Sequence, residues 1–317
     1  MTGAGGFVGS GLVGELLKLG QLQAGGPRIT SLTAIDLRLP EHVDRRLRLM
    51  SGDIADPAFQ AEVFEQPFDV FFHLAAIPGG AAAADYRLGW RINVETTVAL
   101  FEALAAQPKP PRVVFSSSIG VFGVPLPKDK VDDETLPLPT MSYGTQKLIA
   151  EALLADLSRR GLVDGLAVRL PGIVARPRIA GGHLSAYLSN IFHALAAGET
   201  FTCPVSPEAT SWFMSRSRCI DNLIHAAALP SEHLTARAFN LPALHLSMTA
   251  LIDGLASQFG SNVRNLVSYA PDPVLQAQFG TYPLLMTPIA DRLGFRHDGE
   301  PAMLVANSLE LDVGIKG

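Results

Sequence analysis

The chain begins with three glycines in a spacing that leaves few folds open. They are Gly3, Gly6 and Gly9 in the stretch TGAGGFVG, and a helical pattern over residues 7–22 follows them. Glycine permits a tight turn and a close approach of the backbone to a pyrophosphate, and the amide groups that begin a helix favour a negative charge. The pattern predicts a dinucleotide-binding turn, although alone it also fits the ordinary start of a glycine-rich helix.

Strand and helix patterns alternate along the first half of the chain, which predicts an α/β fold. The apolar runs at 69–76 and 112–118 are typical of buried parallel strands. We therefore expect a Rossmann-type, doubly wound parallel sheet in a NAD-binding domain over residues 1–170. Residues 171–317, with a loose proline-bearing tail, should form mainly a small C-terminal substrate-binding lobe, some segments of which return to the sheet. The other expected elements are strands at 29–36, 47–53, 165–170 and 266–269 and helices at 57–66, 86–106, 142–160, 184–197, 220–229 and 247–259.

Composition excludes several classes of function. The net charge is −5 and no long basic run occurs, so the chain is not expected to bind nucleic acid. No stretch is apolar enough to span a membrane, and the first residues do not read as a signal peptide. The two cysteines, Cys203 and Cys219, form no metal-binding pattern with histidines, so no metal site is expected. A reduced, cytoplasmic location fits this cysteine content.

No strand-length segment precedes the glycine pattern, although such a turn normally follows a strand in the middle of the sheet. Without that strand, its neighbours would lose their hydrogen-bonding partners. We therefore expect the first strand to lie before Met1, in a chain longer than the one given.

Asp36 ends the predicted strand at 29–36 and lies 27 residues after Gly9. A carboxylate at this place can accept hydrogen bonds from the adenosine ribose hydroxyls and repels a 2′-phosphate. Asp36 therefore favours NAD over NADP, and the nearby Arg38 weakens this preference slightly. Taken alone, Asp36 could equally well cap a strand.

Tyr143 and Lys147 are four residues apart in SYGTQKLIAE, so they share one face of the predicted helix. An ammonium group near a tyrosine stabilises its phenolate, which makes Tyr143 a candidate general base. Ser118 ends a predicted buried strand, and the ends of parallel strands face the ligand crevice. Taken alone, the spacing of Tyr143 and Lys147 is common on solvated helix faces, and a serine at the end of a strand is common in local turns.

Six stretches together resemble the extended short-chain dehydrogenases/reductases, also called NAD-dependent epimerases/dehydratases. They agree with that family in order and spacing, including the 25 residues from Ser118 to Tyr143. The stretches are TGAGGFVG, GDI (52–54), HLAA (73–76), INVETT (92–97), SSSIGVFG (116–123) and SYGTQK (142–147).

The resemblance implies roles for individual residues. Tyr143 would be the base, Lys147 would bind the nicotinamide ribose and tune Tyr143, and Ser118 would orient the reacting oxygen. Asn93 would support Lys147, whereas His73 is interpreted as a buried strand histidine without a chemical role. The residues expected to contact NAD are Gly3, Gly6, Phe7, Val8, Gly9, Asp36, Asp53, Ile54, Leu74, Ala75, Ala76, Asn93, Ser116, Tyr143, Lys147, Pro171, Ile173 and Val174.

The substrate class rests on a departure from the family pattern. Family members that act on nucleotide sugars usually have an R-x-F-N stretch after the sixth strand, whereas this chain reads RLPGIVARP at 169–177. Residues 142–177, together with Trp212 and the stretch SRSRCIDNLIHAA at 215–227, resemble the subgroup that oxidises the 2-hydroxyl of D-erythronate with NAD. A small sugar acid is thus the expected substrate, and a nucleotide-sugar 4-epimerase or dehydratase with retained NAD is the alternative. The carboxylate of a sugar acid needs a cation or a nest of hydrogen-bond donors, and Arg216 or Arg218 is the favoured cation. The candidate substrate residues are Ser118, Tyr143, Arg176, Arg178, Ser185, Asn190, Arg216 and Arg218.

Family members commonly form homodimers through two long helices, here 86–106 and 142–160. The apolar positions that could form this contact, or face their own sheet instead, are Val94, Val98, Phe101, Leu148, Ala152 and Leu153.

Overall fold

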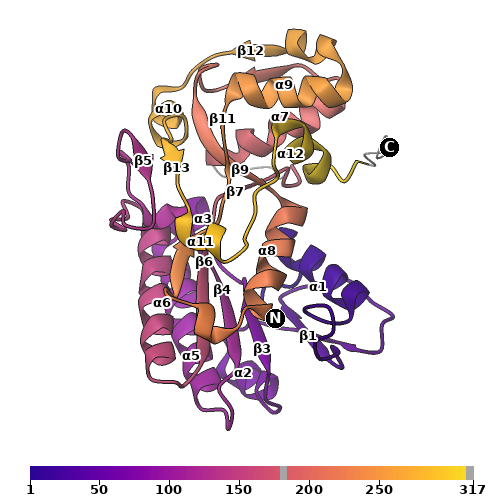
Figure 1. The fold of residues 1–317 in the computed structure, drawn as a ribbon, viewed down its shortest axis with the longest axis vertical. Coiled ribbons are helices and arrows are strands. Elements are labelled where there is room, and N and C mark those ends of the chain that lie inside the picture. The colour runs from indigo at the N-terminus through magenta and orange to yellow at the C-terminus, as the bar shows by residue number, and fades with distance from the viewer. Residues whose placement is uncertain (179–183, 312–317) are drawn as a thin grey trace. The chain divides into compact units, whose positions relative to one another are not determined.

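The computed structural model describes residues 1–178 and 184–311, which form two compact units. The first unit comprises Met1–Gly123, Pro137–Leu170 and Ile220–Phe239. The second comprises Val124–Leu136, Pro171–Cys219 and the residues from Asn240 onward. Each unit is described by itself below (Figure 1).

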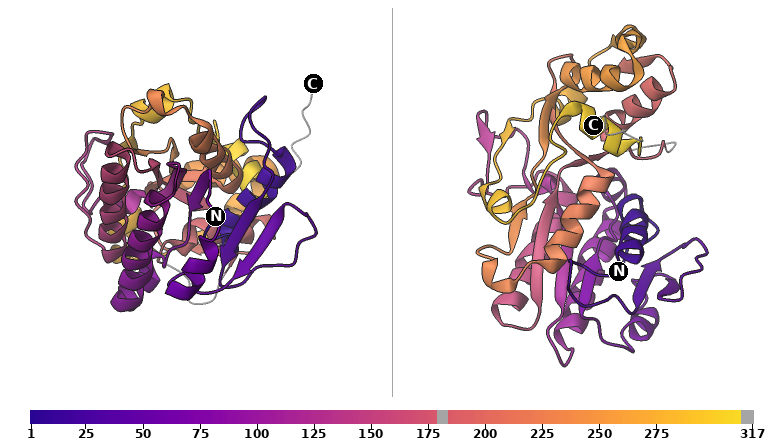
Figure 2. Two further views of the ribbon diagram at one scale, coloured as in Figure 1. Left: turned by 90° about the horizontal axis from the view of Figure 1, so that it is seen from below. Right: turned by 45° about the vertical axis from the view of Figure 1, so that its right-hand side comes forward.

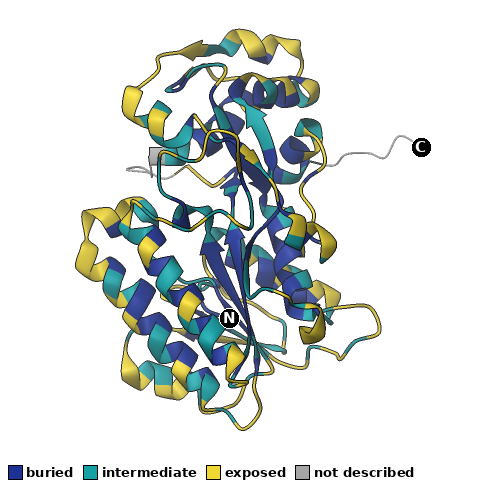
Figure 3. Ribbon diagram, turned by 60° about the vertical axis from the view of Figure 1, so that its left-hand side comes forward, coloured by how far each residue is buried: buried dark blue, intermediate teal, exposed yellow. Residues whose placement is uncertain are grey.

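The first unit is built on a sheet whose strands run β2-β1 on one side and β3-β4-β6-β10 on the other. The pairs β1/β2, β3/β4 and β4/β6 are parallel, with Phe115 opposite Ala167, for example. Its apolar strands are buried, as Figure 3 shows, which is why they read as unbroken apolar runs in the sequence. The strands are β1 (Leu32–Asp36), β2 (Leu47–Ser51), β3 (Val70–His73), β4 (Arg112–Ser118), β6 (Asp164–Leu170) and β10 (Ala238–Asn240).

Residues 1 and 2 occupy the position between β1 and β3. Thr2 forms parallel bridges with Ile35 of β1 and with His73 of β3. The Thr2 amide donates to the Phe72 carbonyl at 3.0 Å, and the Ile35 amide donates to the Met1 carbonyl at 2.9 Å. The order of the strands therefore reverses at this point, directly before the glycine turn. In open α/β sheets, ligands bind at such a reversal point.

Helices lie on both faces of this sheet (Figures 1 and 2). Helices α5 (Thr97–Ala105) and α6 (Ser142–Arg159) pack on one face, where Phe101 and Leu154 join Phe115 in a buried cluster. Helix α1 (Phe7–Leu19) and the later turns of α8 (Arg216–Ala228) lie on the other. The remaining elements of this unit are α2 (Pro57–Val63), α3 (Gly79–Ala84) and the short 3-10 turns at Ile119–Val121 and Ser231–His233.

The single helix predicted over residues 86–106 is interrupted by a π-turn. It consists of α4 (Tyr86–Trp90), the π-helix η1 (Arg91–Thr96) and then α5. The Thr96 hydroxyl donates to the Arg91 carbonyl at 2.9 Å, five residues earlier, within this wider turn. Such turns often occur at functional sites, and this one contains Asn93.

The second unit has a three-stranded sheet in the order β11-β9-β7. Strand β9 (Thr210–Ser215) is antiparallel to β11 (Leu244–Ser247) and parallel to β7 (Gly172–Val174). Sequence patterns had indicated none of these three strands. The other elements here are β5 (Lys130–Val131), β8 (Phe201–Cys203), β12 (Val267–Tyr269), β13 (Leu284–Leu285), the 3-10 turns Leu184–Ala186 and Ser261–Leu266, α7 (Tyr187–Ala196) and α9 (Met248–Phe259).

The prediction of a loose tail was wrong. The tail contains α10 (Pro273–Phe279), α11 (Pro288–Arg292) and α12 (Pro301–Ser308). Each helix begins with a proline, which is favourable at the first helical position because no hydrogen bond is lost there. Helix α12 packs on α9 and buries Leu304 and Val305 completely. Among the described residues, no helix is both long and apolar enough to cross a membrane.

Candidate active site

The glycine turn forms a cradle that larger side chains would fill. Gly3 has a φ of 72°, and a Cβ atom there would lie 2.6 Å from the Ala75 amide nitrogen. A Cβ at Gly9 would lie 2.0 Å from the Gly3 carbonyl oxygen. Helix α1 follows with no acidic residue in its first turn and no side chain capping it. The start of this helix therefore suits a pyrophosphate group, and the residues present fit a dinucleotide.

Asp36 lies beside this turn and holds its backbone. One carboxylate oxygen accepts from the Gly5 amide at 2.9 Å and the other from the Leu37 amide at 2.7 Å. The side chain is partly exposed, so its remaining acceptor capacity suits the hydroxyl groups of a ribose. Asp53, also expected to contact NAD, forms an ion pair with Arg91 at 2.8 Å, and Ile54 beside it is buried.

Tyr143 is positioned by very close packing between α6 and the segment after β4. A Cβ atom at Gly144 would lie 1.9 Å from the Gly120 carbonyl oxygen, so only glycine permits this approach. The Gly120 amide donates to Ser118 Oγ at 3.0 Å. A Cβ at Gly120 would lie 3.2 Å from that Oγ and 3.6 Å from Cδ1 of Tyr143. Ser118 and Tyr143 therefore lie against the same glycine, although they are 25 residues apart.

Lys147 lies one helical turn beyond Tyr143 and is buried. Its Nζ donates to the Ser116 carbonyl at 2.8 Å and lies 5.6 Å from the centroid of the Tyr143 ring. Burial lowers the pKa of Lys147 to about 7, and the charge of Glu151 opposes this change. The lysine can therefore gain or lose its proton near neutral pH, and in its charged form it favours a phenolate on Tyr143.

Asn93, in the π-turn, connects the end of β3 to α6. Its side chain accepts from the Ile77 amide at 2.8 Å and donates to the Ile77 carbonyl at 2.9 Å. The same amide group donates to Gln146 at 2.7 Å. These contacts fix the segment that follows Ala76 and the residue that precedes Lys147. Asn93 is thus linked to the neighbourhood of Lys147 through Gln146.

His73 is buried, with both ring nitrogens in hydrogen bonds. Nδ1 lies 2.7 Å from the Thr2 hydroxyl and Nε2 lies 2.9 Å from the Thr97 hydroxyl. Burial, together with the nearby charge of Lys147, lowers the pKa of His73 to about 3. The imidazole is therefore neutral at physiological pH, and its contacts agree with a structural role.

Comparison with known proteins identifies the family. The model of the NAD dependent epimerase/dehydratase family matches residues 1–233. This chain belongs to that family. It is therefore an NAD-dependent oxidoreductase that acts on a small-molecule substrate with a nicotinamide cofactor.

Several relatives of this epimerase/dehydratase chain align over nearly its whole length. D-erythronate dehydrogenase from Cupriavidus necator is 36% identical, with 94% of this chain and 93% of the relative covered. D-erythronate dehydrogenase from Haemophilus influenzae is 31% identical, with 99% of each covered. The crystal structure of a nucleoside-diphosphate-sugar epimerase from Agrobacterium tumefaciens is 33% identical and superposes with a TM-score of 0.91, covering 99% of this chain and 93% of that one.

A buried ionic cluster, which no sequence motif indicated, lies behind the pair of Tyr143 and Lys147. Arg169 and Glu151 form an ion pair at 2.8 Å, and both side chains are at least nine-tenths buried. Ser117 Oγ donates to the same carboxylate. A charged residue inside the apolar strand GLAVRL could have signalled this cluster, because a buried arginine requires a partner.

The residues expected to bind the substrate carboxylate belong to the second unit, and their grouping with Tyr143 stays a prediction. Arg178 forms an ion pair with Glu199 at 2.8 Å, and Arg216 forms one with Glu310 at 3.2 Å. Arg176 donates to the Ile173 carbonyl at 3.1 Å, and the Arg218 amide donates to a serine hydroxyl at the end of β9. The other expected residues of this unit are Pro171, Ile173 and Val174, which are buried, and Ser185 and Asn190, which are half-buried.

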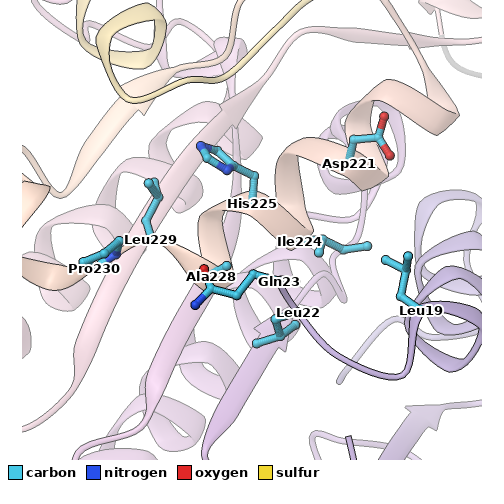
Figure 4. Close-up of a pocket in the computed structure, with 9 residues that line it drawn as sticks. All are labelled: Leu19, Leu22, Gln23, Asp221, Ile224, His225, Ala228, Leu229 and Pro230. Carbon is cyan, nitrogen blue, oxygen red and sulfur yellow. The ribbon is translucent and has the colours of Figure 1, made fainter. Parts of the chain in front are cut away.

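A separate hollow of about 330 Å³ lies between the end of α1 and the later turns of α8 (Figure 4). Leu19 and Ile224 give it apolar walls, and Asp221 and His225 lie at its side. No residue of the glycine turn or of the Tyr143 cluster lines it. It is therefore distinct from the candidate active site.

Proposed function

We propose that this enzyme oxidises the 2-hydroxyl of a short sugar acid, of the D-erythronate type, to the 2-oxo acid with NAD. One observation carries the reaction type: Ser118 and Tyr143 lie against the same glycine, and the buried Lys147 lies one turn behind the phenol ring. The two full-length relatives named D-erythronate dehydrogenase support the choice of substrate.

The preference for NAD rests on Asp36. Its carboxylate is partly exposed and is held beside the glycine turn by the Gly5 amide. A 2′-phosphate placed there would meet a like charge, whereas ribose hydroxyls would find an acceptor.

In the proposed reaction, the phenolate of Tyr143 removes the proton from the 2-hydroxyl of the substrate. When bound, NAD supplies the acceptor for the hydride that leaves C2. Ser118 donates a hydrogen bond to the substrate oxygen as this oxygen becomes a carbonyl. Charged Lys147 stabilises the phenolate before the proton is transferred. We expect Arg216 or Arg218 to bind the carboxylate of the substrate.

A nucleotide-sugar epimerase is the second candidate, and the similarity to the Agrobacterium tumefaciens epimerase favours it. The stretch RLPGIVARP at 169–177 argues against it. Nucleotide-sugar enzymes of this family usually carry an R-x-F-N stretch at this place. An epimerase would retain its cofactor and release no net NADH.

The test is a panel of four-carbon sugar acids and nucleotide sugars, offered with NAD while the absorbance of NADH is followed. We expect NADH from a sugar acid and none from the nucleotide sugars. Tyr143→Phe should reduce kcat at least about a hundredfold. Tyr86→Phe is the matched control, because Tyr86 is exposed and stacks on Trp90. Normal turnover by Tyr143→Phe would refute the assignment of the base.

We also propose that the protein forms a homodimer through α5 and α6. Val94 and Phe101 are buried within this unit, so the contact would rest on the half-buried or exposed positions Val98, Leu148 and Ala152. Light scattering on the eluting protein should give twice the mass of the chain, and Ala152→Arg should halve it.

A further inference from the structure

We propose that Glu151 is a positioning residue that keeps Lys147 protonated in its buried site and thereby sets the pH range in which Tyr143 acts. This proposal rests on the proposed function, because it concerns the same tyrosine. Glu151 touches neither substrate nor cofactor in that scheme, and it acts through Lys147.

The first argument is the way in which α6 is attached to β4. Lys147 and Glu151 are four residues apart and lie on the same buried face of α6. Lys147 donates to the carbonyl of Ser116, whereas Glu151 accepts from the hydroxyl of Ser117, the next residue of the strand. Successive turns of the helix are thus fixed to successive residues of β4. The carboxylate and the ammonium group are held on one side of the helix, and neither can turn to water.

The second argument is the pairing of the Glu151 carboxylate with Arg169. Arg169 donates to it from Nε at 3.0 Å and from Nη2 at 2.8 Å. The Arg169 guanidinium in turn lies over the ring of Phe122, 5.3 Å from the centroid. Because an arginine stays charged in proteins, the carboxylate beside it is a fixed negative charge near Lys147.

The third argument is the balance of charges around Lys147. Burial lowers its pKa to about 7, and the charge of Glu151 raises that pKa. Among the described residues, the other titratable groups that face it are Tyr143 on the same helix and His73 on β3. His73 is neutral, because its pKa is lowered to about 3. Arg169 on β6 faces the carboxylate of Glu151. Without Glu151, Lys147 would lose its proton below neutral pH, and the phenolate of Tyr143 would lose its stabilising charge.

The direct test is Glu151→Gln, which retains the shape and a hydrogen-bonding partner for Ser117 but removes the charge. We expect the rising limb of the pH profile of kcat to move upward by about one pH unit, with about a tenfold loss of rate at neutral pH. The rate should recover in alkaline solution. A residue with a merely structural role would lower kcat by the same factor at every pH.

A second readout needs neither cofactor nor substrate. The ultraviolet absorbance of tyrosinate is followed with pH, and the signal of the matching Tyr143→Phe protein is subtracted. Burial raises the pKa of Tyr187, Tyr269 and Tyr282, and the subtraction removes the signal of these side chains together with that of Tyr86. Glu151→Gln should move the Tyr143 signal to higher pH. This measurement stays informative even if Tyr143→Phe proves active and the proposed function fails.

Two controls separate charge from packing. Glu151→Asp keeps the charge and should retain the pH profile of the parent enzyme. Asp164→Asn breaks an ion pair with Arg112 at the opposite end of β6 and should leave that profile unmoved. If Glu151→Gln does not fold because Arg169 is left unpaired, the double variant Glu151→Gln/Arg169→Met removes both charges and should show the same upward move. An unmoved limb together with an unmoved Tyr143 titration, in either variant, overturns the proposal.

Discussion

Replacing Lys147 by methionine should make the folded protein more stable at neutral pH. The Lys147 side chain is buried, and burial lowers its pKa from 10.5 to about 7. Holding the proton in this site at pH 7 therefore costs about 5 kcal/mol of unfolding free energy. Methionine cannot form the hydrogen bond to the Ser116 carbonyl, and this loss lowers the free energy of unfolding by about 1–2 kcal/mol. We expect a net gain of about 3 kcal/mol, accompanied by loss of activity.

The sign of the pH dependence follows from the proton counts. Between pH 7 and 10.5 the unfolded chain holds a proton on Lys147 that the folded protein releases. The parent protein should therefore gain stability as the pH rises through this range, by about 1.4 kcal/mol per pH unit from this group. The methionine variant lacks this contribution, so its advantage should be greatest at or below pH 7 and should disappear towards pH 10.5.

Urea unfolding of both proteins without cofactor, at neutral pH and about two pH units higher, measures this difference. Lys18→Met is the control, because the Lys18 side chain is 75% exposed and pairs with Glu15 on the helix surface. Its effect on stability should be small at both pH values. A Lys147→Met protein that is less stable than its parent at neutral pH, or a difference that does not change with pH, would refute the reasoning.

Two further predictions concern the dinucleotide site. Gly9→Ala should abolish NADH binding measured by fluorescence, because its Cβ would meet the Gly3 carbonyl. Gly14→Ala is the control on the same helix, because a Cβ at Gly14 meets nothing within 4 Å. It should raise the free energy of unfolding by about 1 kcal/mol without changing NADH binding. Asp36→Asn should reduce the preference for NAD over NADP at least about tenfold, because the like charge is removed; equal NADP binding by parent and variant would contradict the assignment of Asp36.

The parts of the site that follow local rules were predictable from the sequence. The spacing of Tyr143 and Lys147 fixes their common helix face, and the apolar run before Ser118 fixes its place at a strand end. Membership of the family and the α/β fold followed from such stretches, and the comparisons confirm both. The assignments of the individual site residues stay predictions.

Other features depend on contacts that the sequence does not specify. The pair of Glu151 and Arg169 joins a helix to a strand 18 residues later. The contact of Gly144 with Gly120 appears only when α6 lies on the end of β4. In the tail, prolines were interpreted as marks of irregular structure, but Pro273, Pro288 and Pro301 begin helices that packing stabilises.

The close packing at Gly144 has a consequence for how such an enzyme can diversify. Tyr143 and Ser118 both lie against Gly120, so neither residue can move without disrupting the packing of α6 on the end of β4. Every arginine considered for the acid group, in contrast, comes from the second unit. Under the proposed function, new ligands can then be acquired by altering that unit while Tyr143 and Ser118 are retained. Two relatives of similar identity to this chain do bear the names dehydrogenase and epimerase.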